Sequence, residues 1–197
     1  MERMVMFNNR EVVVVGNGVS RKNQDLLAWK YRCGSMIGCN QLYKETIPDI
    51  LVSADWKMSM QIMKDVPFYP GMHIYRDRSV WKVRVGRMIL VSLDLSGWSS
   101  GGRALWFAGS LCDPEVVHVI GFDLDWTPDG KYNNMYAGDE LYKPEGSKLT
   151  PPDNFIKQFV QTVERFPKIK FIRYIPTMDA VNKTLDKFAN VEHRLYE

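Results

Sequence analysis

A run of four valines is the feature of this sequence that most constrains the fold. The segment from Glu11 to Val15 is short, apolar and β-branched, and Gly16, Asn17 and Gly18 follow it directly. A strand that is covered on both faces has this composition, because all its side chains then lie in the core. Such strands occur almost only in parallel sheets whose connections are helices. The run therefore predicts an α/β fold.

Apolar runs and helical patterns alternate along the rest of the chain. We expect further strands at 35–39, 50–53, 116–120 and 171–175, and helices at 21–31 behind Ser20, at 104–108, over 155–166 and over 178–188. Segments 73–75 and 88–91 also have strand character, whereas the charged stretch 76–87 allows no assignment. The alternation predicts one α/β domain over 1–197, a Rossmann-like three-layer sandwich with a mostly parallel sheet and helices on both faces.

Composition excludes several classes of protein. The 26 Lys and Arg against 23 Asp and Glu give a formal charge of +3 that is spread along the chain, so there is no strong signal for nucleic-acid binding. Three cysteines without CxxC spacing and three dispersed histidines predict a reduced, cytoplasmic protein without a structural metal. No stretch reaches the roughly 18 apolar residues of a membrane-spanning helix, and no signal peptide is visible. We expect a soluble protein with no membrane partner.

Polar side chains directly follow the predicted strands. They are Asn17, Ser20, Asn40, Asp55, Asp123 and Asp125. In an open α/β sheet, ligands bind outside the carboxyl ends of the strands. Any one of these residues is explained as well by the usual preference for Asn, Asp and Ser at the ends of elements. Their convergence predicts a ligand-binding site.

Two glycine-containing turns are candidates for binding a phosphate. The turn 16–20 joins a strand to a helix start, where free N–H groups and glycines favour an approaching anion. Segment 99–102 opens a second helix, and a helix cap with close packing explains it equally well. Arg21 replaces the third glycine of the dinucleotide fingerprint, and Asn40 stands where NAD needs an acidic residue. These departures, and the absence of a Walker motif, exclude the nicotinamide, flavin and Walker-type classes.

Asp123 and Asp125 form an Asp-x-Asp motif. On a strand the two would share one side and could bind Mg²⁺, Mn²⁺ or a sugar hydroxyl, although capping of the strand end explains them comparably well. Segment 126–150 follows, with prolines, glycines and tyrosines but no periodicity, which predicts a lid or loop insertion over the site. No hydrolase motif is present, and His118 lies in an apolar run that predicts a core position.

Four short motifs resemble, in order and approximate spacing, the bacterial sialyltransferases of glycosyltransferase family 42. They are Val-Val-Val-Gly-Asn-Gly-Val-Ser-Arg at 13–21, Gly-Cys-Asn-Gln-Leu-Tyr at 38–43, Ser-Gly at 100–101 and Val-Ile-Gly-Phe-Asp at 119–123. The scheme is also similar to that of a wider group with motility-accessory proteins and an archaeal hydroxymethylpterin pyrophosphokinase. It extends over about residues 11–175, with a poor match in the middle.

The resemblance implies roles for individual residues. Asn17, Gly18 and Asn40 would contact the nucleotide of CMP-sialic acid, and Ser100 and Gly101 would line the donor site. Asp123 would correspond to the Asp of the Gly-x-Asp strand end in the family. Of the two tyrosines that bind the leaving phosphate there, one would correspond to Tyr132 or Tyr136; the other falls near Asp125, which departs from the pattern. The histidine base of the family has no counterpart, because Ser-Lys-Leu-Thr stands at 147–150. Asp125 or Asp139 would have to substitute.

We therefore predict a sialyltransferase-like glycosyltransferase that uses a nucleotide-activated sugar and a glycan or other small acceptor. Gly16 and Ser20 would help to hold the phosphate, Asp55 would line the donor site, and Asp125 and Tyr136 would act in catalysis. We expect that no cofactor is required. The alternative is that Asp123 and Asp125 bind Mg²⁺ or Mn²⁺. Two alternative functions stay open: a pterin-type pyrophosphokinase that uses ATP and Mg²⁺, and a nucleotide-binding protein without catalysis. A homo-oligomer and a bacterial or phage origin are compatible with the sequence.

Overall fold

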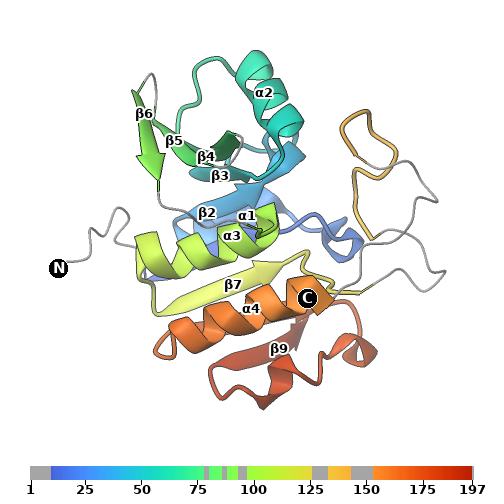
Figure 1. Ribbon diagram of the computed structural model, residues 1–197. Helices are drawn as coiled ribbons and strands as arrows, with labels where there is room; N and C mark the ends of the chain where they lie inside the picture. Colours follow the sequence, from blue (N-terminus) through green and yellow to red (C-terminus); the bar gives the residue numbers. More distant parts are fainter. Residues whose placement is uncertain are drawn as a thin grey trace.

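The computed structural model describes residues 10–77, 80–85, 88–92, 97–125, 133–142 and 153–196. Nine strands in these ranges form one sheet in the order β6-β5-β4-β3-β2-β1-β7-β8-β9 (Figure 1). They are β1 (Glu11–Val15), β2 (Met36–Cys39), β3 (Ile50–Ser53), β4 (Met72–Asp77), β5 (Val80–Val85), β6 (Met88–Ser92), β7 (Val116–Ile120), β8 (Lys170–Ile175) and β9 (Val191–Leu195). All neighbours pair in parallel except β5, which is antiparallel to β4 and to β6.

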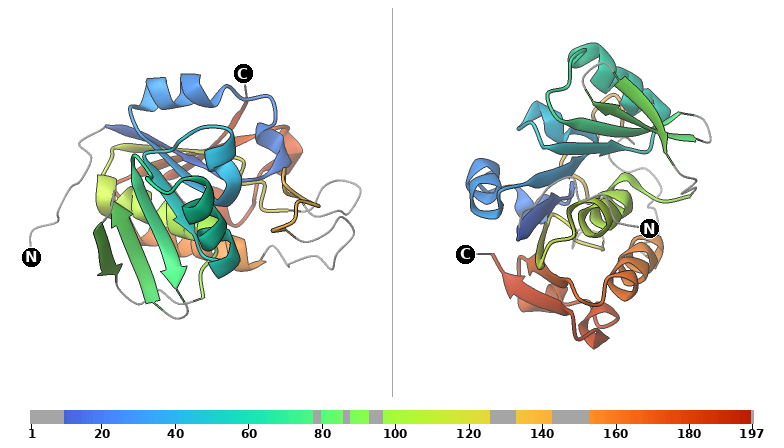
Figure 2. Two further views of the ribbon diagram at one scale, coloured as in Figure 1. Left: turned by 90° about the horizontal axis from the view of Figure 1, so that it is seen from above. Right: turned by 90° about the vertical axis from the view of Figure 1, so that its left-hand side faces the viewer.

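Helices cover both faces of this sheet (Figures 1 and 2). On one face lie α1 (Leu26–Cys33), the 3-10 segment η2 (Asn40–Lys44) and α2 (Trp56–Asp65), and on the other lie α3 (Ser100–Phe107) and α4 (Asp153–Arg165). Val13 and Val15 pack in the α1 layer, and Val12 and Val14 pack in the layer of α3 and α4. All four valines are fully buried, which explains the unbroken apolar run. The predicted three-layer α/β fold with a mostly parallel sheet is confirmed.

The strand order reverses between β1 and β7. From β1 the chain proceeds through β2 and β3 to β4 at one side of the sheet, and from β7 it proceeds through β8 to β9 at the other. The connections from the ends of β1 and β7 therefore diverge toward opposite layers. A crevice forms outside the carboxyl ends of two such strands, and this is where open α/β sheets bind ligands.

Two of the predicted helices differ in the structure. The first begins at Leu26, because the Asp25 carboxylate accepts hydrogen bonds from the N–H groups of Leu27 and Ala28 (both 3.0 Å) and caps it. Ser20 does not cap this helix, since its side chain is bonded elsewhere, and 19–21 form only a 3-10 turn. The expected helix over 178–188 is replaced by two short 3-10 turns, Met178–Ala180 and Leu185–Lys187.

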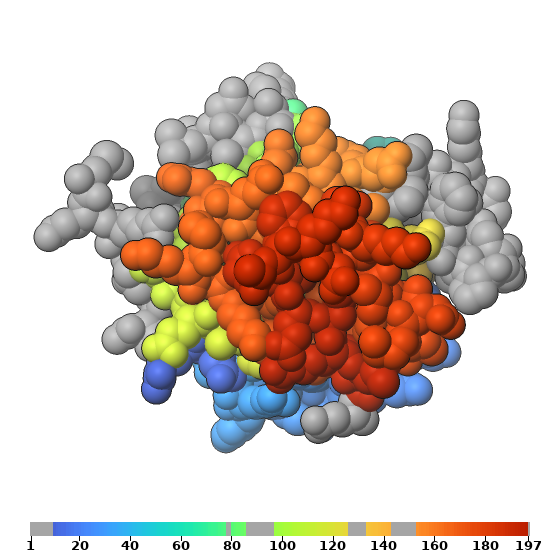
Figure 3. Space-filling view, turned by 90° about the horizontal axis from the view of Figure 1, so that it is seen from below, coloured from blue at the N-terminus to red at the C-terminus, as the bar shows by residue number. Residues whose placement is uncertain are grey.

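The strands that the sequence did not resolve lie toward the two edges of the sheet. β5 falls within the charged stretch 76–87, where Arg84 donates to the Val66 carbonyl (2.7 Å) and Trp81 is fully buried. β9 was missed altogether, because its Glu192 and Arg194 interact with each other at the surface. In the view from below, the C-terminal segment with β9 lies beside α4 on the surface (Figure 3). Within the described ranges, none of the helices is long and apolar enough to cross a membrane.

Candidate functional site

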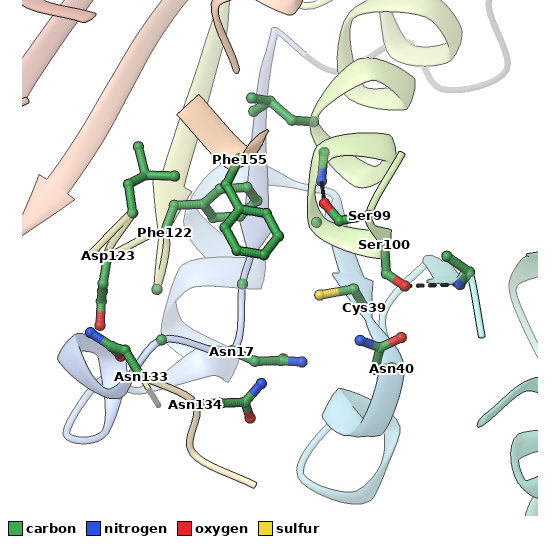
Figure 4. Close-up of a pocket in the computed structure, with 18 of the residues that line it drawn as sticks. Asn17, Cys39, Asn40, Ser99, Ser100, Phe122, Asp123, Asn133, Asn134 and Phe155 are labelled. Atoms are coloured by element: carbon green, nitrogen blue, oxygen red, sulfur yellow. Dashed lines mark hydrogen bonds between the residues drawn. The ribbon is translucent and has the colours of Figure 1, made fainter. Parts of the chain in front are cut away.

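A cavity of about 420 Å³ lies outside the carboxyl ends of β1 and β7 (Figure 4). Its walls come from the turn after β1, the ends of β2 and β3, the start of α3, segment 121–125 after β7, segment 133–142 and the start of α4. Small-molecule sites typically enclose roughly 300–1,000 Å³ and occur at the switch point of α/β sheets. Position and size therefore both indicate a ligand-binding site.

Most of the residues that the sequence predicted for the site line this cavity. They are Gly16, Asn17, Gly18, Asn40, Asp55, Ser100, Gly101, Asp123 and Asp125. Ser20 and Tyr136 lie behind the wall rather than in it, and Tyr132 lies outside the described residues. Asp55 also caps α2, since its Oδ1 accepts from the N–H groups of Lys57 (2.9 Å) and Met58 (3.2 Å).

The start of α3 is held rigidly and opens toward the cavity. Ser99 Oγ accepts from the Gly102 N–H (3.1 Å) and donates to Gln158 Oε1 (2.7 Å), and Ser100 Oγ accepts from the Ala54 N–H (2.8 Å). Among the described residues, no acceptor pairs with the N–H groups of Ser100 and Gly101. The first N–H groups of a helix point along its axis and carry its positive end, so the two are available to an anion in the cavity.

The glycine turn after β1 is already filled by the protein itself. Gly18 N–H donates to the Gly121 carbonyl (2.8 Å), and Val19 N–H to Asn133 Oδ1 (2.9 Å). Ser20 donates to Asp123 through both its N–H (3.1 Å) and its hydroxyl. A Cβ on Gly18 would lie only 2.5 Å from Asp123 Cγ. The Asp123 carboxylate thus occupies the place where the sequence led us to expect a phosphate, and a phosphate there would have to displace it.

Two asparagine side chains in the cavity wall (Figure 4) each have a buried oxygen that no donor in the described chain reaches. Asn17 is only 9 % exposed; its Nδ2 donates to the Tyr142 hydroxyl (3.0 Å), while no donor in the described chain reaches its buried Oδ1. Asn40 Oδ1 is likewise buried without a partner, and its backbone has φ +54°, a left-handed conformation that asparagine tolerates well. A buried carbonyl oxygen without a donor costs about 1–3 kcal/mol. To accept a hydrogen bond from a ligand in the cavity, either side chain would have to turn its Oδ1 toward it.

The Tyr136 hydroxyl is hydrogen-bonded to the half-buried ion pair of Arg21 and Glu45 beside the cavity. Arg21, 1 % exposed, donates through Nε to the Gly16 carbonyl (2.6 Å), through both terminal nitrogens to Glu45 (3.0 Å each) and through Nη2 to the Tyr136 hydroxyl (3.0 Å). The Tyr136 hydroxyl in turn donates to Glu45. Burial and the bond to Glu45 raise the pKa of Tyr136. To act on a substrate, this hydroxyl would first have to leave Glu45.

The described middle of the expected lid, residues 133–142, lies against the mouth of the cavity. Met135 N–H donates to the Asn17 carbonyl (2.8 Å), and Gln41 Nε2 donates to Asp139 Oδ1 (2.9 Å). Asp139 also lies 3.6 Å from the Lys44 ammonium. These contacts bring Asn133, Asn134, Leu141 and Tyr142 into the cavity wall, none of which the sequence analysis singled out. The remainder of 126–150 lies outside the described residues.

Asp123 and Asp125 do not sit side by side on a strand, as their spacing suggested. β7 ends at Ile120, and Leu124 between the two aspartates has φ +57°. Asp123 is turned toward Ser20, and Asp125 is exposed at the rim. In the described part of the chain, no third metal-binding side chain accompanies them. The predicted same-face pair is therefore wrong.

The sequence analysis also missed the residue that holds segment 121–125 in place. Arg173 on β8 is 1 % exposed, and it donates through Nε to the Phe122 carbonyl and through Nη2 to the Asp123 carbonyl (both 2.7 Å). Burial lowers the pKa of Arg173 to about 10, so the guanidinium stays charged at neutral pH. An arginine inside an apolar strand was the available signal.

Comparison with known proteins gives no relative: no family model, no curated protein and no solved structure matches this chain. The resemblance to sialyltransferases therefore stays a prediction from short motifs. Any function has to be argued from the site itself.

The ion pair of Arg21 and Glu45 predicts a pH dependence of stability. Burial raises the pKa of Glu45, but the hydrogen bonds from Arg21 and Tyr136 outweigh this and leave it below the usual 4.5. A carboxylate whose pKa is lower in the folded state stabilises the folded protein at pH values above its unfolded-state pKa. This contribution is lost as the pH falls through the folded-state pKa. We expect the free energy of unfolding, from urea titrations, to fall below about pH 4.5, and to fall less steeply in Glu45→Gln.

The matched control is Glu140→Gln, on an exposed glutamate of segment 133–142. Its free energy of unfolding should fall with decreasing pH as steeply as that of the unsubstituted protein. If Glu45→Gln and Glu140→Gln show the same slope, Glu45 is not the group responsible.

Proposed function

We propose that this chain binds a nucleotide-activated sugar in the switch-point cavity, with the phosphate at the start of α3, and transfers the sugar to an acceptor hydroxyl. The observation that carries the proposal is the pairing of two kinds of unsatisfied group in one cavity. The N–H groups of Ser100 and Gly101 can donate to a phosphate, and the side chains of Asn17 and Asn40, whose Oδ1 atoms have no donor, can turn to accept from a base.

The charge of the cavity favours a donor with a single phosphate. Among the described residues that line it there is no Lys, Arg or His, while Asp55, Asp123 and Asp125 contribute carboxylates. The start of a helix supplies roughly half a positive charge, which suits one phosphodiester but not the triphosphate of ATP. A CMP-linked sugar therefore fits better than the ATP of the pyrophosphokinase alternative.

The asparagines favour a base that presents an amine. Cytosine carries an exocyclic amine that donates hydrogen bonds, whereas uracil has an acceptor oxygen at the same place. The amide oxygens of Asn17 and Asn40 would accept from such an amine and be repelled by the uracil oxygen. Phe155 adds an aromatic face in the same cavity (Figure 4), on which a base or a sugar ring can stack.

The transfer itself needs a group that takes the proton of the acceptor hydroxyl. The acceptor oxygen forms a bond to the anomeric carbon, the bond from this carbon to the phosphate oxygen breaks, and the nucleoside monophosphate leaves with the electron pair. We assign the proton to Asp125, whose carboxylate lies at the exposed rim of the cavity next to segment 121–124. Asp123 is turned away from this role, because its carboxylate accepts two hydrogen bonds from Ser20.

Calorimetric titration with CMP, UDP and ATP, each with and without Mg²⁺, tests the binding half of the proposal. We expect CMP to bind without metal and more tightly than UDP. Gly101→Asp would place a carboxylate beside the phosphate and weaken CMP binding by about 100-fold, as expected for two like charges in contact near a protein surface. Gly101→Asn, of the same size but neutral, should weaken it less.

Two results would overturn this half. Selective, Mg²⁺-dependent binding of ATP would favour the pyrophosphokinase, and an unchanged CMP affinity in Gly101→Asp would remove the phosphate from α3.

Release of CMP from CMP-sialic acid, followed by mass spectrometry, tests the transfer. Asp125→Asn should slow release by about 100-fold or more with CMP affinity retained. If CMP binds but the unsubstituted protein releases none with any acceptor offered, the chain is a binding protein without this catalysis.

A further inference from the structure

Three side chains of metal-binding type meet in the α1 layer, at a place that the proposed function does not use. They are Glu11 at the start of β1, Cys33 at the end of α1 and His118 in the middle of β7. One ligand atom of each lies within 4.8 Å of those of the other two. None of the three lines the cavity, which opens at the opposite, carboxyl ends of these strands.

The sheet register explains why residues so distant in sequence converge. His118 is paired with Val13 across the parallel strands, and Glu11 lies two residues before Val13 on the same face of β1. That face is covered by α1, whose last residue, Cys33, packs in the same cluster as Val13. Cys33 and His118 are 3 % and 2 % exposed, whereas the Glu11 side chain is 42 % exposed.

We propose that Glu11, Cys33 and His118 form a zinc-binding site. Sulfur, imidazole nitrogen and carboxylate oxygen are the three ligand types that Zn²⁺ takes in proteins, and a tetrahedral site separates its ligand atoms by roughly 3.5 Å. His118 Nε2 and Glu11 Oε2 are 3.0 Å apart, and the third atom lies within 4.8 Å of both. Small side-chain rotations therefore suffice to surround an ion.

The histidine is already oriented as a metal ligand. Its Nδ1 lies 3.1 Å from the Tyr174 hydroxyl, which leaves Nε2 to face Glu11. Zinc-bound histidines characteristically use their second nitrogen for such an outer hydrogen bond, which fixes the ring. Trp29 packs edge-on against Tyr174, with ring centroids 4.7 Å apart, and lies 5.7 Å from the His118 ring.

Charge balance also favours a divalent ion. Cys33 is a free, buried cysteine, and zinc binding would displace the proton of its thiol. The resulting thiolate and the Glu11 carboxylate together neutralise Zn²⁺. Arg32 and Arg194 place positive charge near His118, and a site that is neutral once zinc is bound is not repelled by it. Because a proton competes with the ion for the sulfur, the zinc affinity should fall as the pH is lowered.

A zinc site with three protein ligands takes water as its fourth ligand. Its effect on the protein would be to tie the end of α1 to β1 and β7. This role is independent of nucleotide binding at the other end of the strands.

Zinc competition with a chromophoric chelator, and Co²⁺ as a spectroscopic substitute, test the proposal on the full chain in a reductant that does not bind metal. We expect one equivalent of metal per chain and a sulfur-to-cobalt charge-transfer band. Cys33→Ser should abolish the band and weaken zinc binding by about 100-fold, since it removes a ligand. Cys112→Ser, at another buried free cysteine, should change neither.

Tyr174→Phe separates a metal site from a merely packed cluster. It removes the outer hydrogen bond of His118 and should weaken zinc binding by about tenfold or more while the cobalt band stays. CMP affinity should be unchanged in the Cys33 and Tyr174 variants, so that failure of one proposal does not imply failure of the other. A chain that binds no zinc, or that binds it equally in Cys33→Ser and Cys112→Ser, overturns the proposal.

Discussion

Replacing Arg173 with methionine is expected to lower the free energy of unfolding by about 3–5 kcal/mol. The guanidinium donates to the carbonyls of Phe122, Asp123 and Ala180 at 2.7–2.9 Å, and methionine leaves these buried oxygens without donors. A hydrogen bond from a charged group contributes about 1.5–3 kcal/mol, and the relief of burying the charge offsets part of the sum. Urea denaturation at neutral pH measures the difference.

The control for this variant is Arg165→Met, at an exposed arginine near the end of α4, which should stay within about 0.5 kcal/mol of the unsubstituted protein. Arg173→Lys should be intermediate, because an ammonium can reach only some of the carbonyls. Since Phe122 and Asp123 line the cavity, CMP binding should weaken in parallel. A loss of less than about 1 kcal/mol in Arg173→Met would mean that the carbonyls find other donors, and that Arg173 does not hold segment 121–125.

The core of the fold was predictable because its signal is local. Val12 to Val15 are buried from both sides, so four consecutive apolar residues sufficed to identify β1 and, with it, a parallel sheet. β5 and β9 carry charged residues instead. β9 is an edge strand, so one side of it is free of neighbours and its residues reflect contact with water as much as pairing. β5 lies between β4 and β6, and its Arg84 donates to the carbonyl of Val66, outside the sheet. Their strand character is set by neighbours that are distant in sequence.

The position of the cavity could be predicted from the sequence, but the hydrogen bonds between its residues could not. Parallel strands end at one edge, so polar residues after β1, β2, β3 and β7 had to converge there. The hydrogen bonds at this edge join residues that are far apart in the sequence: Ser20 with Asp123, Arg173 with Phe122, and Asn133 with Val19. No spacing within a short motif encodes such pairs. The same reason hid the cluster of Glu11, Cys33 and His118, whose members looked unrelated along the sequence.

Gly16→Ala and Gly101→Ala are expected to have opposite effects on stability. A Cβ on Gly16 would lie 2.3 Å from the Gly121 carbonyl oxygen and 2.7 Å from the Phe122 ring, so the ends of β1 and β7 would have to move apart. We expect Gly16→Ala to lower the free energy of unfolding by about 3 kcal/mol. This is at the upper end of what overpacking costs, because the atoms that would have to move belong to the backbone. A Cβ on Gly101 meets only Phe122, at 3.5 Å, and alanine in a helix gains up to about 1 kcal/mol over glycine.

This pair of variants decides what the glycines after β1 are for. The sequence allowed them to admit an anion, whereas in the structure they admit the protein's own backbone at Gly121 and its own carboxylate at Asp123. If the packing explanation holds, Gly16→Ala destabilises the chain in the absence of any ligand, as urea denaturation will show. A Gly16→Ala protein as stable as Gly101→Ala, but with weakened CMP binding, would instead return the phosphate to this turn and remove it from the start of α3.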